Sequence, residues 1–158
     1  PYVDMTRQLV RVFPRNGGTL EIEPDASSGS YFWAAGALLN TPVAVRRWPV
    51  HGWQVDAAFP RFLPLPETLS RERDLGDSIM TAIVMAPLRF TDLGRLRVQE
   101  CERVEALRTE LTRCGARVEE VEDTLTVYPG PLQGATIETY NDHRMAMCFA
   151  TVGLKVPG

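Results

Sequence analysis

Residues 140–147, YNDHRMAM, place polar and charged side chains directly before an apolar segment, a pattern that predicts the N-terminus of a helix. Asn141 or Asp142 is a suitable N-cap, because a short polar side chain can accept hydrogen bonds from free backbone N–H groups. Gly153 is a suitable end for this helix. The side chains expected to face the core are those of Ala146, Phe149, Ala150 and Val152. The stretch therefore predicts a well-capped helix packed on the core.

His143 and Arg144 fall in the first turn of this helix. The helix dipole at that end favours anions, so a cation there is mildly unfavourable for the helix itself. An arginine in this position therefore suggests a negatively charged ligand. A capped core helix with a surface arginine explains the same residues equally well, and this segment alone leaves both interpretations open.

Length and composition indicate one ordinary folded domain. The chain has 158 residues, of which 44% are hydrophobic and 23% charged. A net charge of -3 argues against the clustered basic face of a nucleic-acid-binding protein. Three widely spaced cysteines form no zinc or disulfide pattern, which favours a reducing cytosol. No apolar run approaches the roughly 20 residues that span a bilayer.

Helical and strand patterns alternate along the chain, which predicts an α/β fold. Helices are expected at 6–12, 31–39, 56–62, 79–85 and 99–114, and a loop at 63–74. Strands are expected at 19–23, 43–48, 88–90, 117–121, 124–128 and 136–139. Similar polar segments precede three helices, at 24–27, 75–78 and 140–143. They suggest a repeated unit whose helix N-termini converge on one anion-binding face, although ordinary capping also explains each segment.

Two further charged sites each allow two interpretations. Glu100 and Arg103 lie three residues apart on one helix face, which favours an exposed ion pair but also fits a proton-transfer carboxylate beside an anion clamp. Asp77 fits an N-cap, the simpler interpretation in isolation, or a base that faces a substrate hydroxyl.

Three segments together resemble the signatures of the 5-enolpyruvylshikimate-3-phosphate (EPSP) synthase family. They are Glu23-Pro24-Asp25-Ala26-Ser27-Ser28-Gly29-Ser30-Tyr31-Phe32, Gln99-Glu100-Cys101-Glu102-Arg103 and Tyr140 to Met147. The opening Pro1 to Thr6 and the stretch Asp77 to Thr81 are also similar to this family. The resemblance runs nearly from end to end, and the third segment is the most specific.

The resemblance implies a fold of repeated βαβαββ units in two similar domains that face a cleft. Residues 1–158 would form most of the C-terminal domain, with the N-terminal domain and a further lysine outside this sequence. The spans near 12–17, 55–76 and 85–88 look shorter than is usual in the family. We expect either a compact relative or a sequence from which loop residues are missing.

The implied reaction transfers the enolpyruvyl group of phosphoenolpyruvate to the 5-hydroxyl of shikimate 3-phosphate, without a metal or organic cofactor. By motif position, Asp77 would be the base near the shikimate hydroxyl, and Glu100 would transfer a proton at the phosphoenolpyruvate side. Arg103 and Arg144 would bind the carboxylate and phosphate of phosphoenolpyruvate, because a guanidinium fork matches those oxygens. His143 would support Arg144.

The sequence departs from the family pattern at positions expected to hold shikimate 3-phosphate. Gln99 stands where a lysine is usual, and Arg95 where an asparagine is usual. The lost lysine contact is worth about 1.5–3 kcal/mol in general, and Arg95 or Arg97 could replace it. Glu102 stands where aspartate is usual, which is a milder change.

The expected partners are the two substrates and the N-terminal domain, with no nucleic acid and no membrane. The expected location is the cytoplasm, or a plastid in a plant. Two other functions fit the sequence. One is a non-catalytic folding or anion-binding module derived from the enzyme, and the other is a relative of the UDP-N-acetylglucosamine enolpyruvyl transferase.

Overall fold

The computed structural model describes residues 2–158 as a mixed α/β protein. Four short strands form one sheet in the order β1-β2-β4-β3. Their bounds are Thr68–Ser70 for β1, Arg89–Thr91 for β2, Val118–Val121 for β3 and Thr124–Val127 for β4. The helices are α1 (Tyr2–Val12), α2 (Ala26–Leu39), α3 (Ile79–Met85), α4 (Arg103–Arg113) and α5 (His143–Gly153). Two 3-10 helices, η1 (Val55–Phe62) and η2 (Gly94–Val98), complete the fold.

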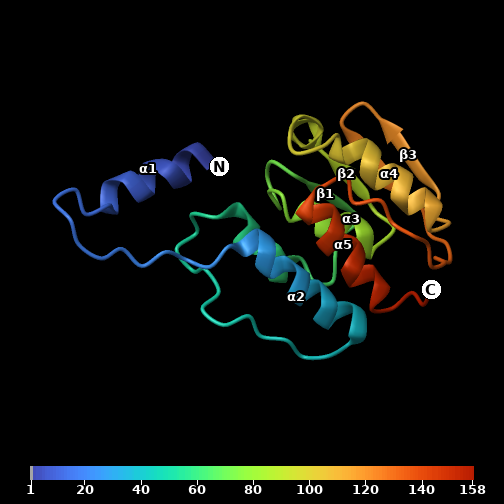
Figure 1. Cartoon of the computed structure of the whole chain (residues 1–158), viewed down its shortest axis with the longest axis horizontal. Helices are drawn as coiled ribbons and strands as arrows, with labels where there is room; N and C mark the ends of the chain where they lie inside the picture. The colour runs from blue at the N-terminus through green and yellow to red at the C-terminus, as the bar shows by residue number, and fades with distance from the viewer. Residues whose placement is uncertain (1) are drawn as a thin grey trace.

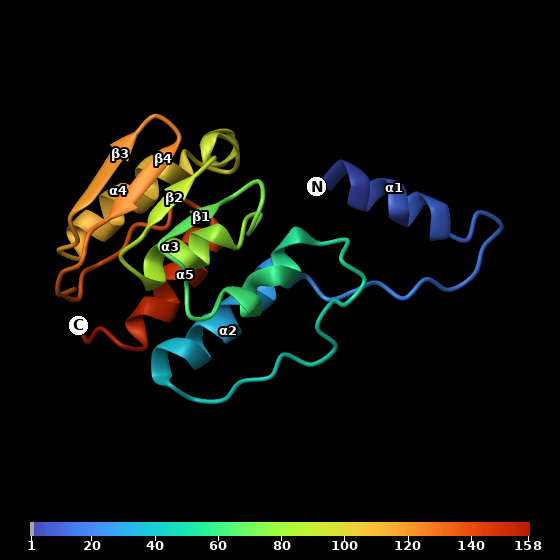
Figure 2. The same ribbon diagram turned by 180° about the vertical axis from the view of Figure 1, so that it is seen from behind.

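Strand β1 is parallel to β2, whereas β4 is antiparallel to both β2 and β3. Helices α3, α4 and α5 lie against one face of the sheet, and α2 packs outside α3 and α5 (Figures 1 and 2). The strands turn Phe90, Leu125 and Val127 into this core, while Arg89 on β2 stays exposed. The period of two in these strands therefore separates a buried from an open face.

Helices α2, α3 and α5 pack together near their N-terminal halves. Ser30 Oγ of α2 lies 2.8 Å from Thr81 Oγ1 of α3, and Thr81 Oγ1 lies 3.9 Å from Cys148 Sγ of α5. All three side chains are buried. This packing brings the N-terminal ends of the three helices to one side of the molecule, as their similar polar segments suggested.

The predicted helices are mostly confirmed, with shifted boundaries. The expected helix at 99–114 begins at Arg103, because residues 99–102 follow η2 as an irregular segment that ends at the N-cap Glu102. Helix α2 begins at Ala26, capped by Asp25, five residues earlier than predicted. Gly115, with φ 87°, follows α4 as expected for a residue that ends a helix.

The buried face of α5 was predicted only in part. Phe149 and Val152 are buried as expected, but Ala150 is exposed and Ala146 only partly covered. The larger Met145 and Cys148 fill the core instead. Helix spacing puts these four buried residues at i, i+3, i+4 and i+7 on one face.

Three predicted strands are wrong, and so is the loop at 63–74, which contains β1. Residues 19–23, 43–48 and 136–139, all within the described chain, form no strand. The first segment leaves Ile22 76% exposed. In the last, the Glu138 N–H and the Thr136 carbonyl bond to side chains of α4 rather than to a neighbouring strand. Alternation alone predicted these strands, but a strand also needs a partner edge.

Helix α1 extends away from the rest of the molecule (Figure 1). It buries none of its residues. Its tertiary hydrogen bonds come from the Tyr2 hydroxyl, which donates to Asp56 and accepts from the backbone N–H of Asp77. Tyr2 therefore ties the start of the chain to the start of α3. None of the helices within residues 2–158 is long and apolar enough to cross a membrane.

Candidate active site

Asp77 lies at the centre of a cluster of arginines at the N-terminal end of α3. Its Oδ1 accepts a hydrogen bond from Arg71 Nη2 at 2.7 Å, and its Oδ2 accepts one from Gln99 Nε2 at 3.2 Å. Arg144 Nη2 and Arg103 Nη1 lie 3.7 and 3.8 Å from Oδ2. Ser78, not Asp77, occupies the N-cap position of α3. The Asp77 carboxylate therefore faces cations rather than capping the helix.

Arg103, the first residue of α4, is fully buried and fully engaged. Its Nε donates to Asp142 Oδ2 at 2.6 Å, and its Nη2 lies 3.3 Å from Asp142 Oδ1. Its Nη1 donates to Gln99 Oε1, and its Nη2 pairs with Glu100 Oε2, each at 2.6 Å. Two-point pairing with a buried carboxylate fixes both the position and the plane of the guanidinium.

Asp142 both caps α5 and binds Arg103. It is the N-cap of α5, where Oδ1 accepts hydrogen bonds from the backbone N–H groups of Arg144 at 2.8 Å and Met145 at 3.4 Å. The same carboxylate binds Arg103. Burial alone would raise the pKa of Asp142, but the hydrogen bonds and charge of Arg103, with the backbone donors, lower it below its ordinary value.

Arg144 sits in the first turn of α5 with its side chain mostly covered. Burial would lower its pKa, but the nearby carboxylate of Asp77 leads the contributions that raise it, so Arg144 stays a cation. Burial raises the pKa of Tyr31, a buried residue of α2, and the nearby charge of Arg144 opposes that rise. Tyr31 of α2, Asp77 from the segment before α3, and Arg144 of α5 thus lie in this part of the cluster.

The charges around Asp77 keep its carboxylate ionised. Burial would raise the pKa of Asp77, but the hydrogen bond and charge of Arg71, the charge of Arg144 and the amide of Gln99 together lower it. Two polar atoms beside this carboxylate, Arg71 Nε and Ser78 Oγ, are buried without a hydrogen-bond partner among the described residues. The site therefore combines three guanidinium groups near Asp77 with polar atoms that have no partner.

Comparison with known proteins shows the family of the chain. The family model described as EPSP synthase (3-phosphoshikimate 1-carboxyvinyltransferase) matches residues 74–158, more than half of the chain. The chain belongs to the EPSP synthase family. The matched region contains all of the cluster residues described above except Arg71 and Tyr31.

Several relatives carry the name 3-phosphoshikimate 1-carboxyvinyltransferase. The protein of Nostoc punctiforme is 36% identical over 162 residues, which cover 87% of this chain and 38% of the relative. That of Cellvibrio japonicus is 36% identical over 197 residues, covering 95% and 46%. That of Janthinobacterium sp. is 34% identical over 199 residues, covering 98% and 45%. The chain spans less than half the length of these relatives. The longer alignments exceed the chain itself, so those relatives have residues within the matched region that lack a counterpart here.

The structure brings together most of the residues singled out from the sequence. Asp77, Gln99, Glu100, Arg103 and Arg144 form one connected cluster. The Glu100 side chain is 49% exposed, so it lies at the open side of this cluster.

Arg95 and His143 lie apart from it. Both are exposed, and neither forms a hydrogen bond or ion pair with the cluster within residues 2–158. Proximity in sequence to Gln99 and Arg144 did not bring these two side chains into the same contacts. The described residues also contain no group of three or more His, Cys, Asp or Glu side chains placed to hold a metal ion.

Sequence reasoning missed Arg71 and Tyr2. Arg71 fell in a segment interpreted as a charged loop, yet it directly follows β1 and is buried. The apolar Leu69 two residues earlier was the available signal for a strand there. Tyr2 lies 75 residues from Asp77 in the chain, and no local pattern links the two.

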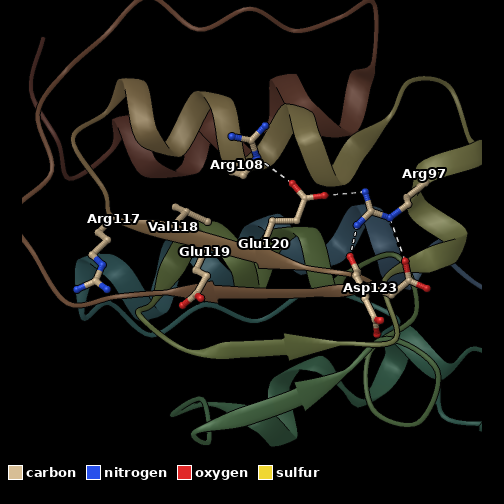
Figure 3. Close-up of a pocket in the computed structure, with 8 residues that line it drawn as sticks. Arg97, Arg108, Arg117, Val118, Glu119, Glu120 and Asp123 are labelled. Atoms are coloured by element: carbon tan, nitrogen blue, oxygen red, sulfur yellow. Dashed lines mark hydrogen bonds and ion pairs between the residues drawn. The ribbon is translucent and has the colours of Figure 1, made fainter.

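A second charged cluster holds the segment that carries Gln99 and Glu100. Arg97, in η2, binds Asp123 at 3.0 Å, Glu120 at 2.8 Å and the α4 N-cap Glu102. Figure 3 shows Arg97 and Arg108 on opposite sides of Glu120, above the β3–β4 hairpin. The irregular segment 99–102 therefore lies between Arg97, which binds Glu102, and Arg103, which binds Gln99 and Glu100.

Proposed function

We propose that this chain is part of an EPSP synthase and takes part in enolpyruvyl transfer from phosphoenolpyruvate to the 5-hydroxyl of shikimate 3-phosphate. The observation that carries the proposal is the convergence of Arg103 and Arg144 on Asp77 within the region that matches the family. Two anionic substrates require cations in fixed positions, and proton movement requires carboxylates beside them. In this proposal the chain forms one of two similar domains built from repeated βαβαββ units.

Arg144 would make the first contact with phosphoenolpyruvate. All three nitrogens of the Arg103 guanidinium already bind carboxylate or amide oxygens. Arg144 lies 3.7 Å from Asp77 Oδ2, beyond hydrogen-bond distance. Among the acceptors on Arg103, Glu100 is the easiest to displace, because half of its side chain is exposed. Movement of Glu100 would open Nη2 of Arg103 to the ligand and leave its carboxyl group beside the vinyl group, where in its protonated form it would deliver a proton to the vinyl carbon.

Asp77 would act as the base toward the shikimate hydroxyl. Its lowered pKa makes it a weak base while the arginines are free of ligand. Anions bound to the same arginines would offset their charge and raise the pKa of Asp77, bringing it closer to the value that proton transfer needs. Substrate binding would therefore activate this carboxylate.

The remaining positions would complete the substrate site. Gln99 already forms hydrogen bonds with both Asp77 and Arg103, so it would fix the position of the base relative to the arginine that binds phosphoenolpyruvate. Exposed Arg95 would reach shikimate 3-phosphate from η2, and exposed His143 would support Arg144 from the rim. The opposite wall would come from an N-terminal domain. The family reaction proceeds in the cytoplasm, or in a plastid in a plant, and we propose the same location here.

Isothermal titration of the 158-residue chain with phosphoenolpyruvate tests the binding half of this proposal. We expect binding that Arg144→Gln weakens by about tenfold or more, because a charge-assisted contact is worth about 1.5–3 kcal/mol. Arg46→Gln is the control, since Arg46 is exposed and outside the cluster. Equal affinity in all three proteins would overturn the assignment of Arg144.

Phosphate release from phosphoenolpyruvate and shikimate 3-phosphate tests the catalytic half. We expect no release by the chain alone and release when the N-terminal domain of the Nostoc punctiforme relative is added. Asp77→Asn should abolish that release without abolishing phosphoenolpyruvate binding. Binding without release in any combination would instead favour an anion-binding module, and release only with UDP-N-acetylglucosamine as acceptor would assign the cell-wall branch.

A further inference from the structure

The turn that leads into α5 is held in an unfavourable backbone conformation. Tyr140 and Asn141 have φ values of 56° and 53°, two consecutive residues in the left-handed region. Asparagine tolerates this region, but a bulky tyrosine rarely adopts it. Such a conformation persists only where surrounding contacts impose it. Asp142 comes directly after this turn, and its backbone N–H bonds to the Thr139 carbonyl at 2.8 Å.

Glu110 of α4 contacts this turn and the residue that precedes it by two. The Tyr140 hydroxyl donates to Glu110 Oε1 at 2.9 Å, and the backbone N–H of Glu138 donates to Oε2 at 3.2 Å. Arg113 Nη1 also lies 2.6 Å from Oε2. Glu110 is fully buried, and a buried carboxylate is tolerated only when its oxygens are bonded in this way.

Glu110 and Arg103 contact the same segment from one helix face. They lie seven residues apart on α4, which corresponds to about two helical turns. Arg103 binds Asp142, and Glu110 binds Tyr140 and the backbone of Glu138. Helix α4 therefore contacts residues 138–142 at two points, through Glu110 at Glu138 and Tyr140 and through Arg103 at Asp142.

We propose that Glu110 is a positioning residue for the anion site. By fixing Tyr140 in the left-handed turn, it places Asp142 where one carboxylate can both cap α5 and orient Arg103. Arg144 follows two residues later, so its position depends on the same turn. This inference about geometry stands by itself, but its consequence for phosphoenolpyruvate binding rests on the proposed function.

A purely structural role for Glu110 is the alternative, and two substitutions distinguish it. Tyr140→Phe removes only the hydroxyl that Glu110 accepts. Glu110→Gln keeps the size of the side chain but leaves it only one oxygen acceptor. Glu105→Gln is the matched control, because Glu105 lies on the exposed side of the same helix. If Glu110 acts through Tyr140, the double variant will be no worse than the more damaging single variant.

The test uses the whole 158-residue chain and two measurements. The first is the exchange rate of the Arg103 Nε–H proton by NMR, which reports its bond to Asp142 without any ligand. We expect exchange roughly tenfold faster in Tyr140→Phe and Glu110→Gln, the effect of weakening one charge-assisted hydrogen bond. The Glu105→Gln control should match the wild type. Unchanged exchange in a folded Tyr140→Phe protein would overturn the positioning role.

The second measurement is phosphoenolpyruvate affinity by calorimetry. Both variants should lose roughly tenfold in affinity, in parallel with the exchange rates. If exchange is faster in the variants but the wild-type chain does not bind phosphoenolpyruvate, the positioning role is upheld and the proposed function is refuted. Faster exchange with unchanged affinity would overturn the link between Glu110 and the anion site.

Discussion

Arg103 Nε and Asp142 Oδ2 lie 2.6 Å apart, and neither side chain is exposed to solvent. The pair joins the first residue of α4 to the N-cap of α5, 39 residues later in the chain. It therefore fixes the relative placement of the two helices that supply both arginines of the proposed anion site.

Removal of the Asp142 carboxylate should be strongly destabilising. Loss of one partner of a buried ion pair costs about 3–5 kcal/mol, because the other charge is left uncompensated. Loss of the N-cap adds about 1 kcal/mol. The two losses are not fully additive, because the same carboxylate makes both contacts. We therefore expect Asp142→Ala to lower the free energy of unfolding, measured in urea, by at least about 3–5 kcal/mol.

Asp25→Ala is the control for capping alone. Asp25 caps α2 through the Ser27 N–H at 2.9 Å, and it is exposed and pairs with no arginine among the described residues. Its replacement should cost about 1 kcal/mol. Similar losses for the two variants would show that the Arg103 pair adds no stability.

The stability of the chain should fall in acid through Asp77 and Asp142. Both carboxylates have folded pKa values below their ordinary value of 3.8. The unfolded state therefore binds more protons than the folded state as the pH falls through this range. The stabilisation is complete above the unfolded pKa and is lost as the pH falls toward the folded values.

Urea unfolding midpoints measured between about pH 6 and about pH 2.5 check this expectation, since linkage relates their slope to proton uptake. The midpoint should be nearly level in the upper part of this range as far as these two groups are concerned. It should fall steeply below about pH 4, where unfolded carboxylates take up protons. Asp142→Asn should flatten the steep part, and an unchanged slope in that variant would contradict the assignment.

The parts of the site that the sequence predicts depend on residues close together in the chain, whereas the parts that it does not predict depend on contacts between distant residues. Helix starts are local, so the polar residues at 24–27 and 140–143 indicated helix starts at α2 and α5, although the first helix was predicted only from residue 31 and begins at Ala26. The second role of Asp142 is not local, because its partner Arg103 belongs to another helix. The sequence therefore predicted Asn141 or Asp142 as a cap, but did not predict that Asp142 orients Arg103.

The same reasoning explains the errors in the sheet. Residues 136–139 alternate as a strand does, but their backbone bonds to Glu110 and Arg113 of α4. Conversely, β1 lies in a proline-rich, charged stretch and forms because β2 offers a parallel edge. Period-two patterns describe which faces a segment can bury, whereas the partner is chosen by the whole fold.

Arg71 should control the ionisation of Asp77. Its Nη2 lies 2.7 Å from Asp77 Oδ1, and its hydrogen bond is the leading contribution that lowers the pKa of that carboxyl group. In Arg71→Gln, burial would be less opposed, so the pKa of Asp77 should rise. A carbon-detected NMR titration of the Asp77 carboxyl carbon measures the shift.

Arg73→Gln is the matched control, because Arg73 lies two residues away and is exposed. It should leave the titration of Asp77 unchanged. An Asp77 pKa that stays at its wild-type value in Arg71→Gln would show that Arg144 and Gln99 alone keep the carboxylate ionised.

Arg97 should govern the mobility of the segment that carries Gln99 and Glu100. It binds Glu102, Glu120 and Asp123. Burial would lower the pKa of Arg97, but the hydrogen bonds to these carboxylates raise it well above its ordinary value, so Arg97 stays charged. In Arg97→Gln, the contact with the α4 N-cap weakens, and amide hydrogen exchange in residues 98–102 should accelerate while the β3–β4 ladder stays protected. Arg117→Gln tests a nearby arginine that stacks on Tyr128, 4.2 Å from the ring centre, and should leave residues 98–102 unchanged. Equal protection of that segment in both variants would mean that Arg103 alone holds it.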